Sequence, residues 1–94
     1  MKQERYLDKD GRRDWIDDCW DILSIEQFEG AMFFTIGKYY KRLGKKDPLE
    51  SEQYKINDYR QRWIEKLGQL IGTVDATKHV NRSIEQAKEM ANDV

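Results

Sequence analysis

The sequence is poor in the residues from which small domains build disulfides and metal sites. Its 94 residues include one cysteine, Cys19, and one histidine, His79. A single cysteine permits no disulfide within the chain, and the two residues together provide too few ligands for a zinc site. The chain must therefore be stabilised by packing, and a reducing compartment suits it.

Long apolar runs are absent as well. The uncharged run from Gly30 to Gly37 is far shorter than the ~20 apolar residues that span a bilayer. The charged start from Met1 to Arg5 is not followed by the apolar segment of a signal peptide. We therefore predict a cytoplasmic protein that does not enter a membrane.

A net charge of −1 argues against a uniformly basic nucleic-acid-binding protein.

Helical spacing is what the sequence does contain. Apolar residues recur at helical intervals in four segments, and no segment alternates as a strand does, so we predict one all-α domain covering residues 1–94. Ser24 and Gln27 have the form of a capping box that starts a helix running to Gly44. Pro48 is expected at the start of the next helix, which Gly72 ends. The short link predicts an antiparallel hairpin, with a core of Phe28, Met32, Ile36, Tyr39, Ile56, Trp63 and Leu67.

Two further helices are expected to flank this hairpin. The first covers roughly residues 12–23. The last covers about residues 75–92, and its apolar side is made mostly of alanine and valine, which predicts weak packing. The first helix is expected to bury Trp15, Ile16, Cys19, Ile22 and Leu23 and to expose Asp14, Asp17, Asp18 and Asp21.

Charges of opposite sign are separated along the chain. Only acidic charges occur between Asp14 and Glu29, and only basic charges occur from Gly30 to Lys46. On an ideal helix four of the basic residues fall within a ~100° sector that also holds Phe34. We call this group the cationic strip; it consists of Lys38, Lys41, Arg42 and Lys45.

Two interpretations of the cationic strip remain open. Closely spaced cations can bind phosphate oxygens while an aromatic ring stacks on a base, and the turn at Gly44, Lys45 and Lys46 adds donors for an anion. Alternatively, the strip is a solvated face that pairs with the acidic first helix. The first interpretation predicts that reversing Arg42 to Glu abolishes nucleotide binding and leaves the fold intact.

Carboxylates provide two more candidate sites. The aspartates of the first helix could hold Mg²⁺, although acids in the first turns also complement the helix dipole. Asp58 lies between Lys55 and Arg62 and could activate a hydroxyl, or it could simply pair with Arg62 one turn away. No phosphate-binding loop of the GxxxxGK[ST] kind is present.

Three segments resemble a known family: Phe28 to Met32, Gly37 to Asp47, and Lys55 to Trp63. They are similar to a pattern of the form KY-x-x-R-x-GKKD, preceded by a glycine-containing helix and followed by K-x-x-D-Y-x-x-R-W. The family consists of small tailed-phage proteins, was catalogued as a domain of unknown function, and includes an early-gene phage nucleotide kinase. The resemblance covers residues 14–67. The chain lacks the upstream His-Pro-containing stretch that many members have.

The resemblance implies a phage-encoded nucleotide-binding protein in the cytoplasm of an infected bacterium. It implies phosphoryl transfer from a nucleoside triphosphate with Mg²⁺ to deoxynucleoside monophosphates such as dTMP and dGMP. Asp58 is then the candidate catalytic residue. The phosphate binders that the resemblance implies are Lys38, Arg42, Lys45, Lys46 and Lys55.

A second function class stays open beside this one. The acidic first helix also fits a non-catalytic phage protein that binds and inhibits a host factor. Nucleic-acid binding through the cationic strip is disfavoured, because the neighbouring acids would repel a phosphate backbone. The aromatic residues outside the main apolar stripe, Phe33, Phe34 and Tyr40, predict a homo-oligomer.

Overall fold

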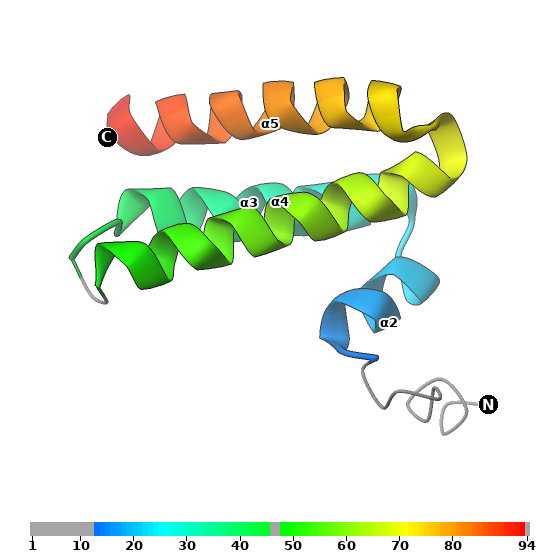
Figure 1. Ribbon diagram of the computed structural model, residues 1–94, viewed down its shortest axis with the longest axis horizontal. Coiled ribbons are helices and arrows are strands. Elements are labelled where there is room, and N and C mark those ends of the chain that lie inside the picture. Colours follow the sequence, from blue (N-terminus) through cyan, green and yellow to red (C-terminus); the bar gives the residue numbers. More distant parts are fainter. Residues whose placement is uncertain (1–12, 46–47, 94) are drawn as a thin grey trace.

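The computed structural model describes residues 13–45 and 48–93, and all regular structure in these ranges is helical. The helices are α2 (Trp15–Ile22), α3 (Ile25–Lys41), α4 (Leu49–Ile71) and α5 (Thr73–Asp93). Figure 1 shows α3 and α4 side by side, with α5 along both of them and the short α2 beside one end. The predicted all-α domain is confirmed.

The hairpin of α3 and α4 forms where local signals predict it. The Ser24 side chain accepts a hydrogen bond from the Gln27 backbone N–H, and the Gln27 side chain accepts one from Ser24 N–H, which completes the predicted capping box. Gly44 has a φ of 76°, in the region that favours glycine, and allows the turn after α3. Pro48 occupies the N-cap of α4 rather than its first helical position.

The core lies between α3, α4 and α5. Phe28, Ile36 and Trp63 are at most 1% exposed, and they bring α3 against α4 as predicted. Tyr39 is only partly buried and packs against the edge of this core. The last turn of α4 lies outside this core, since Leu70 is 54% exposed.

Helix α5 packs more closely than its small side chains predict. Ala76 and Val80 are fully buried, and Ala87 is 2% exposed. A Cβ placed on Gly37 of α3 would lie 3.7 Å from the Ala87 Cβ, so small residues on both helices allow a close approach. Close packing of small residues therefore compensates for the little area that each side chain buries.

Helix α2 does not bury the face that its pattern predicts. Trp15 is 74% exposed and Ile22 is 60% exposed, whereas Asp18 is 2% exposed. Ile16 and Cys19 are partly buried, as expected. Trp20 also packs against the core, with its ring centroid 5.0 Å from that of Phe28. The helix has only eight residues, and the ion pairs described below add to these contacts in fixing its orientation.

The helices show no membrane span. In residues 13–45 and 48–93, no helix is long and apolar enough to cross a bilayer.

Candidate functional site: a cleft beside the hairpin

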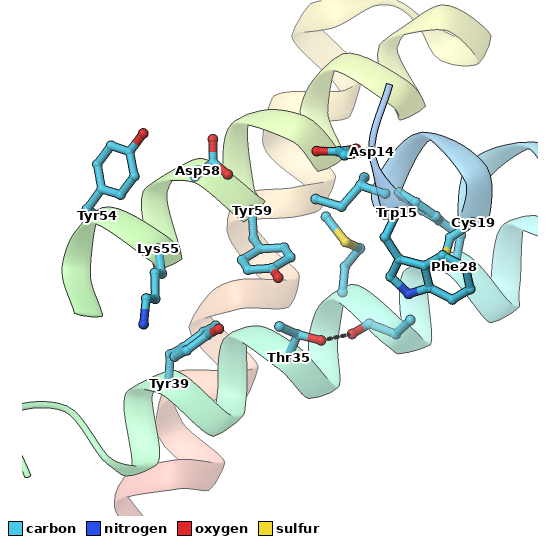
Figure 2. A pocket seen from close by; sticks show the side chains of 13 residues that line it. Asp14, Trp15, Cys19, Phe28, Thr35, Tyr39, Tyr54, Lys55, Asp58 and Tyr59 are labelled. Carbon is cyan, nitrogen blue, oxygen red and sulfur yellow. Dashed lines mark hydrogen bonds between the residues drawn. The ribbon is translucent and has the colours of Figure 1, made fainter. Parts of the chain in front are cut away.

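A cleft of about 390 Å³ lies between α2 and the α3–α4 hairpin, and we call it the α2–hairpin cleft. Figure 2 shows its two ends. Trp15, Cys19 and Phe28 line the end next to α2, and Tyr39 and Lys55 line the other end. One end is therefore apolar and aromatic, and the other is aromatic and cationic.

The wall that α2 contributes is held by ion pairs with α4. The Arg62 guanidinium donates two hydrogen bonds to the Asp14 carboxylate, at 2.8 and 2.9 Å. It also donates one to Asp17 at 3.1 Å, and Lys66 Nζ donates to the same Asp17 oxygen at 2.6 Å. These contacts join residues more than 40 positions apart, so they fix the position of α2 on the hairpin.

The ion pairs shift the pKa values of these groups. The hydrogen bonds from Arg62 hold the pKa of Asp14 well below its ordinary value. Burial of Asp17 acts to raise its pKa, but the hydrogen bond from Lys66 and the positive charges nearby outweigh burial and lower it. The pKa of Arg62 is raised, chiefly by its hydrogen bonds to Asp14. All three groups are therefore held in their charged forms.

The same aspartates offer no metal site in the described part of the chain. Asp14 and Asp17 bind cationic side chains, and Arg13 donates hydrogen bonds to both Asp18 and Asp21. No group of three metal-binding side chains occurs among the described residues. Among the described residues, the partners of the α2 carboxylates are therefore Arg13, Arg62 and Lys66, which occupy the oxygens that a Mg²⁺ ion would need.

Three cations surround the ring of Tyr39 at the polar end of the cleft. Lys38 Nζ lies 5.4 Å from the ring centroid, Arg42 Cζ lies 5.0 Å from it, and Lys55 Nζ lies 5.5 Å from it. We call these four residues the Tyr39 cation cluster. The electron-rich face of the ring attracts the cations and holds them close to one another. Lys38 and Arg42 come from α3, and Lys55 comes from α4.

Arg42 has a second, buried contact that sequence reasoning missed. Its Nε lies 3.4 Å from an Oε of Glu52, whose side chain is fully buried. Neither the Arg42 Nε nor the Glu52 oxygens take part in a hydrogen bond in the described part of the chain. A buried carboxylate without hydrogen bonds depends on the nearby positive charge, so Arg42 stabilises the hairpin as well as the cation cluster. Reversing Arg42 to Glu would therefore disturb the fold, contrary to the prediction.

The remaining predicted site residues lie apart from this cluster. Lys45 is exposed in the turn after α3, and Lys46 lies outside the described residues. Lys41 Nζ donates to the Ala91 carbonyl at 3.4 Å and thus belongs to the α3–α5 side. Asp58 is exposed at the rim of the cleft, and Figure 2 shows its carboxylate directed away from Lys55. Three members of the cationic strip, Lys38, Lys41 and Arg42, also line a groove between α3 and α5, whereas Lys45 lies in the turn.

Tyr59 forms part of the cleft wall. Its ring centroid lies 5.9 Å from that of Tyr39, and burial raises the pKa of its hydroxyl, with Tyr39 adding to the rise. Burial likewise raises the pKa of the Cys19 thiol at the other end of the cleft. Both groups are held in their neutral forms, and neither serves as an anionic nucleophile near neutral pH.

A polar contact between three helices was also missed. His79 Nε2 of α5 lies 2.8 Å from an Oε of Glu29 on α3, and the indole N–H of Trp63 on α4 donates to the same oxygen at 3.2 Å. Glu29 thus satisfies the only polar atom of the buried Trp63 side chain. The three residues lie far apart in the sequence, so no local pattern indicates their contact.

Comparison with known proteins assigns neither a family nor a function to this chain. Neither a family model, nor a curated protein, nor a solved structure matches this chain.

Proposed function

We propose that the α2–hairpin cleft binds a nucleoside phosphate, with the phosphates at the Tyr39 cation cluster and the base toward α2. The observation that carries this proposal is that Lys38, Arg42 and Lys55 surround the ring of Tyr39, which lines the cleft together with Lys55. Such a group presents several charge-assisted donors to one anion.

Lys38 brings positive charge to the cluster that no described carboxylate offsets. Glu52 lies 3.4 Å from Arg42 and offsets the charge of that residue. Asp14 and Asp17 are bound to Arg62 and Lys66, at the other end of the cleft. Lys38 has no carboxylate within ion-pair distance in the described part of the chain, so it can contribute its full charge to a phosphate.

The other end of the cleft suits a planar group. Trp15 lines the cleft at this end, although it is 74% exposed. Exposed aromatic rings can stack on a nucleobase, and such stacking contributes about 1–3 kcal/mol per base. A ligand with one planar part and one anionic part matches this arrangement, and a nucleotide has both.

A more specific version of the proposal is that the chain transfers a phosphoryl group between nucleotides. The resemblance to a phage nucleotide kinase supports this version. Transfer requires a second nucleotide and Mg²⁺, whose charge offsets that of the phosphates. In this version Asp58 at the rim would act on an acceptor hydroxyl. The host-factor alternative has less support, because the acidic helix that suggested it is neutralised within the chain by Arg13, Arg62 and Lys66.

Titration by calorimetry with dTMP, dGMP and ATP, each with and without Mg²⁺, tests the proposal. We expect at least one of them to bind, and the matching deoxynucleoside without phosphate to bind at least tenfold more weakly. Replacing Lys38 and Lys55 together by alanine is expected to weaken nucleotide binding at least tenfold. Arg42 is left unchanged because of its contact with Glu52.

Lys78→Ala is the matched control, because Lys78 is an exposed lysine on α5, outside the cleft. It is expected to leave the affinity unchanged. No binding of any nucleotide to the wild-type chain, or equal binding by the wild type and the double variant, would reject the site. If a nucleotide does bind, Asp58→Asn then tests the more specific version: transfer of phosphate should stop while binding persists.

A further inference from the structure

One exposed ridge runs along α3, away from the buried face of the helix. It consists of residues at four-residue intervals on a single helix face: Glu26, Gly30, Phe34 and Lys38. All four are exposed, and Phe34 is 72% exposed. Residues spaced in this way form a continuous row along a helix, here about 18 Å long.

Gly30 is unexplained by the packing of the chain. It lies in the middle of α3, where glycine is less favourable than alanine. A Cβ added at Gly30 would meet no atom within 4 Å, and Gly30 is not among the glycines of positive φ. Neither crowding nor backbone conformation within the chain requires a glycine here. Its absent side chain leaves room above the helix for a group from outside.

We propose that this ridge is an interface between two copies of the chain, which pack with their α3 helices antiparallel. If a two-fold axis passes near Met32, Phe34 of each copy lies opposite Gly30 of the other. The same register places Lys38 of each copy opposite Glu26 of the other. A large ring thus meets the open space above a glycine, and each basic end meets an acidic end.

The charge pattern of α3 favours this orientation over a parallel one. Acidic residues occupy its first turns and basic residues its last turns, so antiparallel packing brings unlike charges together and parallel packing brings like charges together. This explanation of the charge separation does not involve helix α2, whose Asp17 binds Arg62 and Lys66 of α4 and whose Asp18 and Asp21 bind Arg13.

An apolar groove beside the ridge enlarges the surface. It has a volume of about 480 Å³ between α3 and α5, and its lining includes Phe34, Gly37 and Met90. Met90 is 58% exposed. A second copy seated on the ridge would cover these apolar side chains, which the isolated chain leaves in contact with water.

Sedimentation equilibrium over a range of concentrations up to high micromolar tests the proposal. We expect the wild type to dimerise. Glu26→Lys or Lys38→Glu alone should raise the dimer dissociation constant at least tenfold, because each places like charges opposite each other. The double exchange Glu26→Lys/Lys38→Glu should restore it to within about threefold of the wild type, since the pair is re-formed with reversed polarity.

Gly30→Ala distinguishes an interface from a purely internal role. The substitution should raise the melting temperature of the monomer, since alanine favours a helix, and it should weaken dimerisation, since its Cβ occupies the space for Phe34. Phe34→Ala should weaken dimerisation without unfolding the chain, as circular dichroism would show. Glu65→Lys on α4 reverses an exposed acid away from the ridge and should leave the dimer intact.

A wild-type chain that stays monomeric at high micromolar concentration would overturn the proposal. So would a dimer that persists in Phe34→Ala, or one that the double exchange does not restore. Lys38 belongs both to this ridge and to the Tyr39 cation cluster, whereas Glu26, Gly30 and Phe34 lie outside the α2–hairpin cleft. Glu26→Lys, Gly30→Ala and Phe34→Ala therefore test the interface without changing the proposed phosphate site, and loss of dimerisation in these variants with unchanged nucleotide affinity would separate the two proposals.

Discussion

Two regions of this small domain are held together by different forces. The three long helices enclose an apolar core in which Phe28, Ile36 and Trp63 are at most 1% exposed. Helix α2 makes partly buried apolar contacts through Ile16 and Trp20 and depends in addition on charged hydrogen bonds from Arg62 and Lys66 of α4. Apolar burial is insensitive to salt and to moderate changes of pH, whereas partly exposed ion pairs respond to both. The two regions should therefore respond to different perturbations.

This difference bears on the candidate site, because the cleft lies along the boundary between the two regions. The Tyr39 cation cluster is built on α3 and α4, whereas the Trp15 end of the cleft is built on α2. Conditions that release α2 should remove the aromatic wall and leave the cations in place. The predictions below separate the two regions, beginning with the largest expected effect.

Trp63→Ala should destabilise the whole domain. Trp63 of α4 is 1% exposed and contacts Glu29 of α3 and His79 of α5, so its truncation should cost about 3–5 kcal/mol of unfolding free energy. Urea denaturation followed by circular dichroism measures the loss. Leu70→Ala on the same helix is the control, because Leu70 is 54% exposed, and it should cost less than about 1 kcal/mol. Equal losses in the two variants would contradict the assignment of the buried face.

Glu52→Ala tests the charged contact inside the otherwise apolar region. It should leave Arg42 without its buried partner and cost about 3 kcal/mol. Glu50→Ala is the control, because Glu50 lies two residues before Glu52 and is exposed; it should cost less than about 0.5 kcal/mol.

Replacing Arg42 and Glu52 together by leucine should recover most of the stability lost in Glu52→Ala, because a buried ion pair can be exchanged for apolar side chains at little cost. The same urea denaturation measures all three variants. A double variant that is less stable than Glu52→Ala would indicate that Arg42 supports the hairpin in another way.

These predictions also show how much of the fold could be read from local sequence. The capping box at Ser24, the proline before α4 and the glycine that ends it act within a few residues, so the sequence predicted the bounds of α3 and α4 closely. The faces of α3 and the middle of α4 were also predicted, because long helices repeat their apolar pattern many times.

The faces of α2 could not be predicted in this way. An eight-residue helix has little more than two turns, and its position depends on partners such as Arg62, 48 residues from Asp14. Asp18 is consequently buried and Trp15 exposed, the reverse of the prediction from periodicity.

The candidate site shows the same limit. The sequence indicated a cationic strip on α3, and the resemblance added Lys55 of α4. Neither source indicated that the Tyr39 ring gathers three of these cations or that Glu52 neutralises one of them. Such contacts depend on how helices pack, which local spacing does not encode.

Acidification should release α2 before it unfolds the core. The pKa values of Asp14 and Asp17 are lowered in the folded chain by their contacts with Arg62 and Lys66. Their contribution is therefore complete above the unfolded-state pKa, near 4, and is lost as the pH falls through the folded-state values. We expect a loss of about 1–2 kcal/mol in the attachment of α2 between pH 4 and pH 2.

Hydrogen exchange at the amides of α2 and α4 measures this loss. Protection in α2 should fall first, and in the variant Asp14→Asn/Asp17→Asn it should be low already at neutral pH and change little with acid. Protection that falls at the same pH in both helices would contradict the distinction between the two regions.

Trp15→Ala should have the smallest effect on stability and should separate folding from binding. Trp15 is 74% exposed, so its removal should change the unfolding free energy by no more than about 0.5 kcal/mol. The same ring lines the α2–hairpin cleft, and loss of a stacking surface should weaken binding of a nucleotide about five- to tenfold. Ile22→Ala removes a similarly exposed apolar side chain from the same helix, outside the cleft, and should alter neither quantity. A nucleotide that binds both variants equally well would place its base away from α2, and the cleft would then contribute only its cationic end.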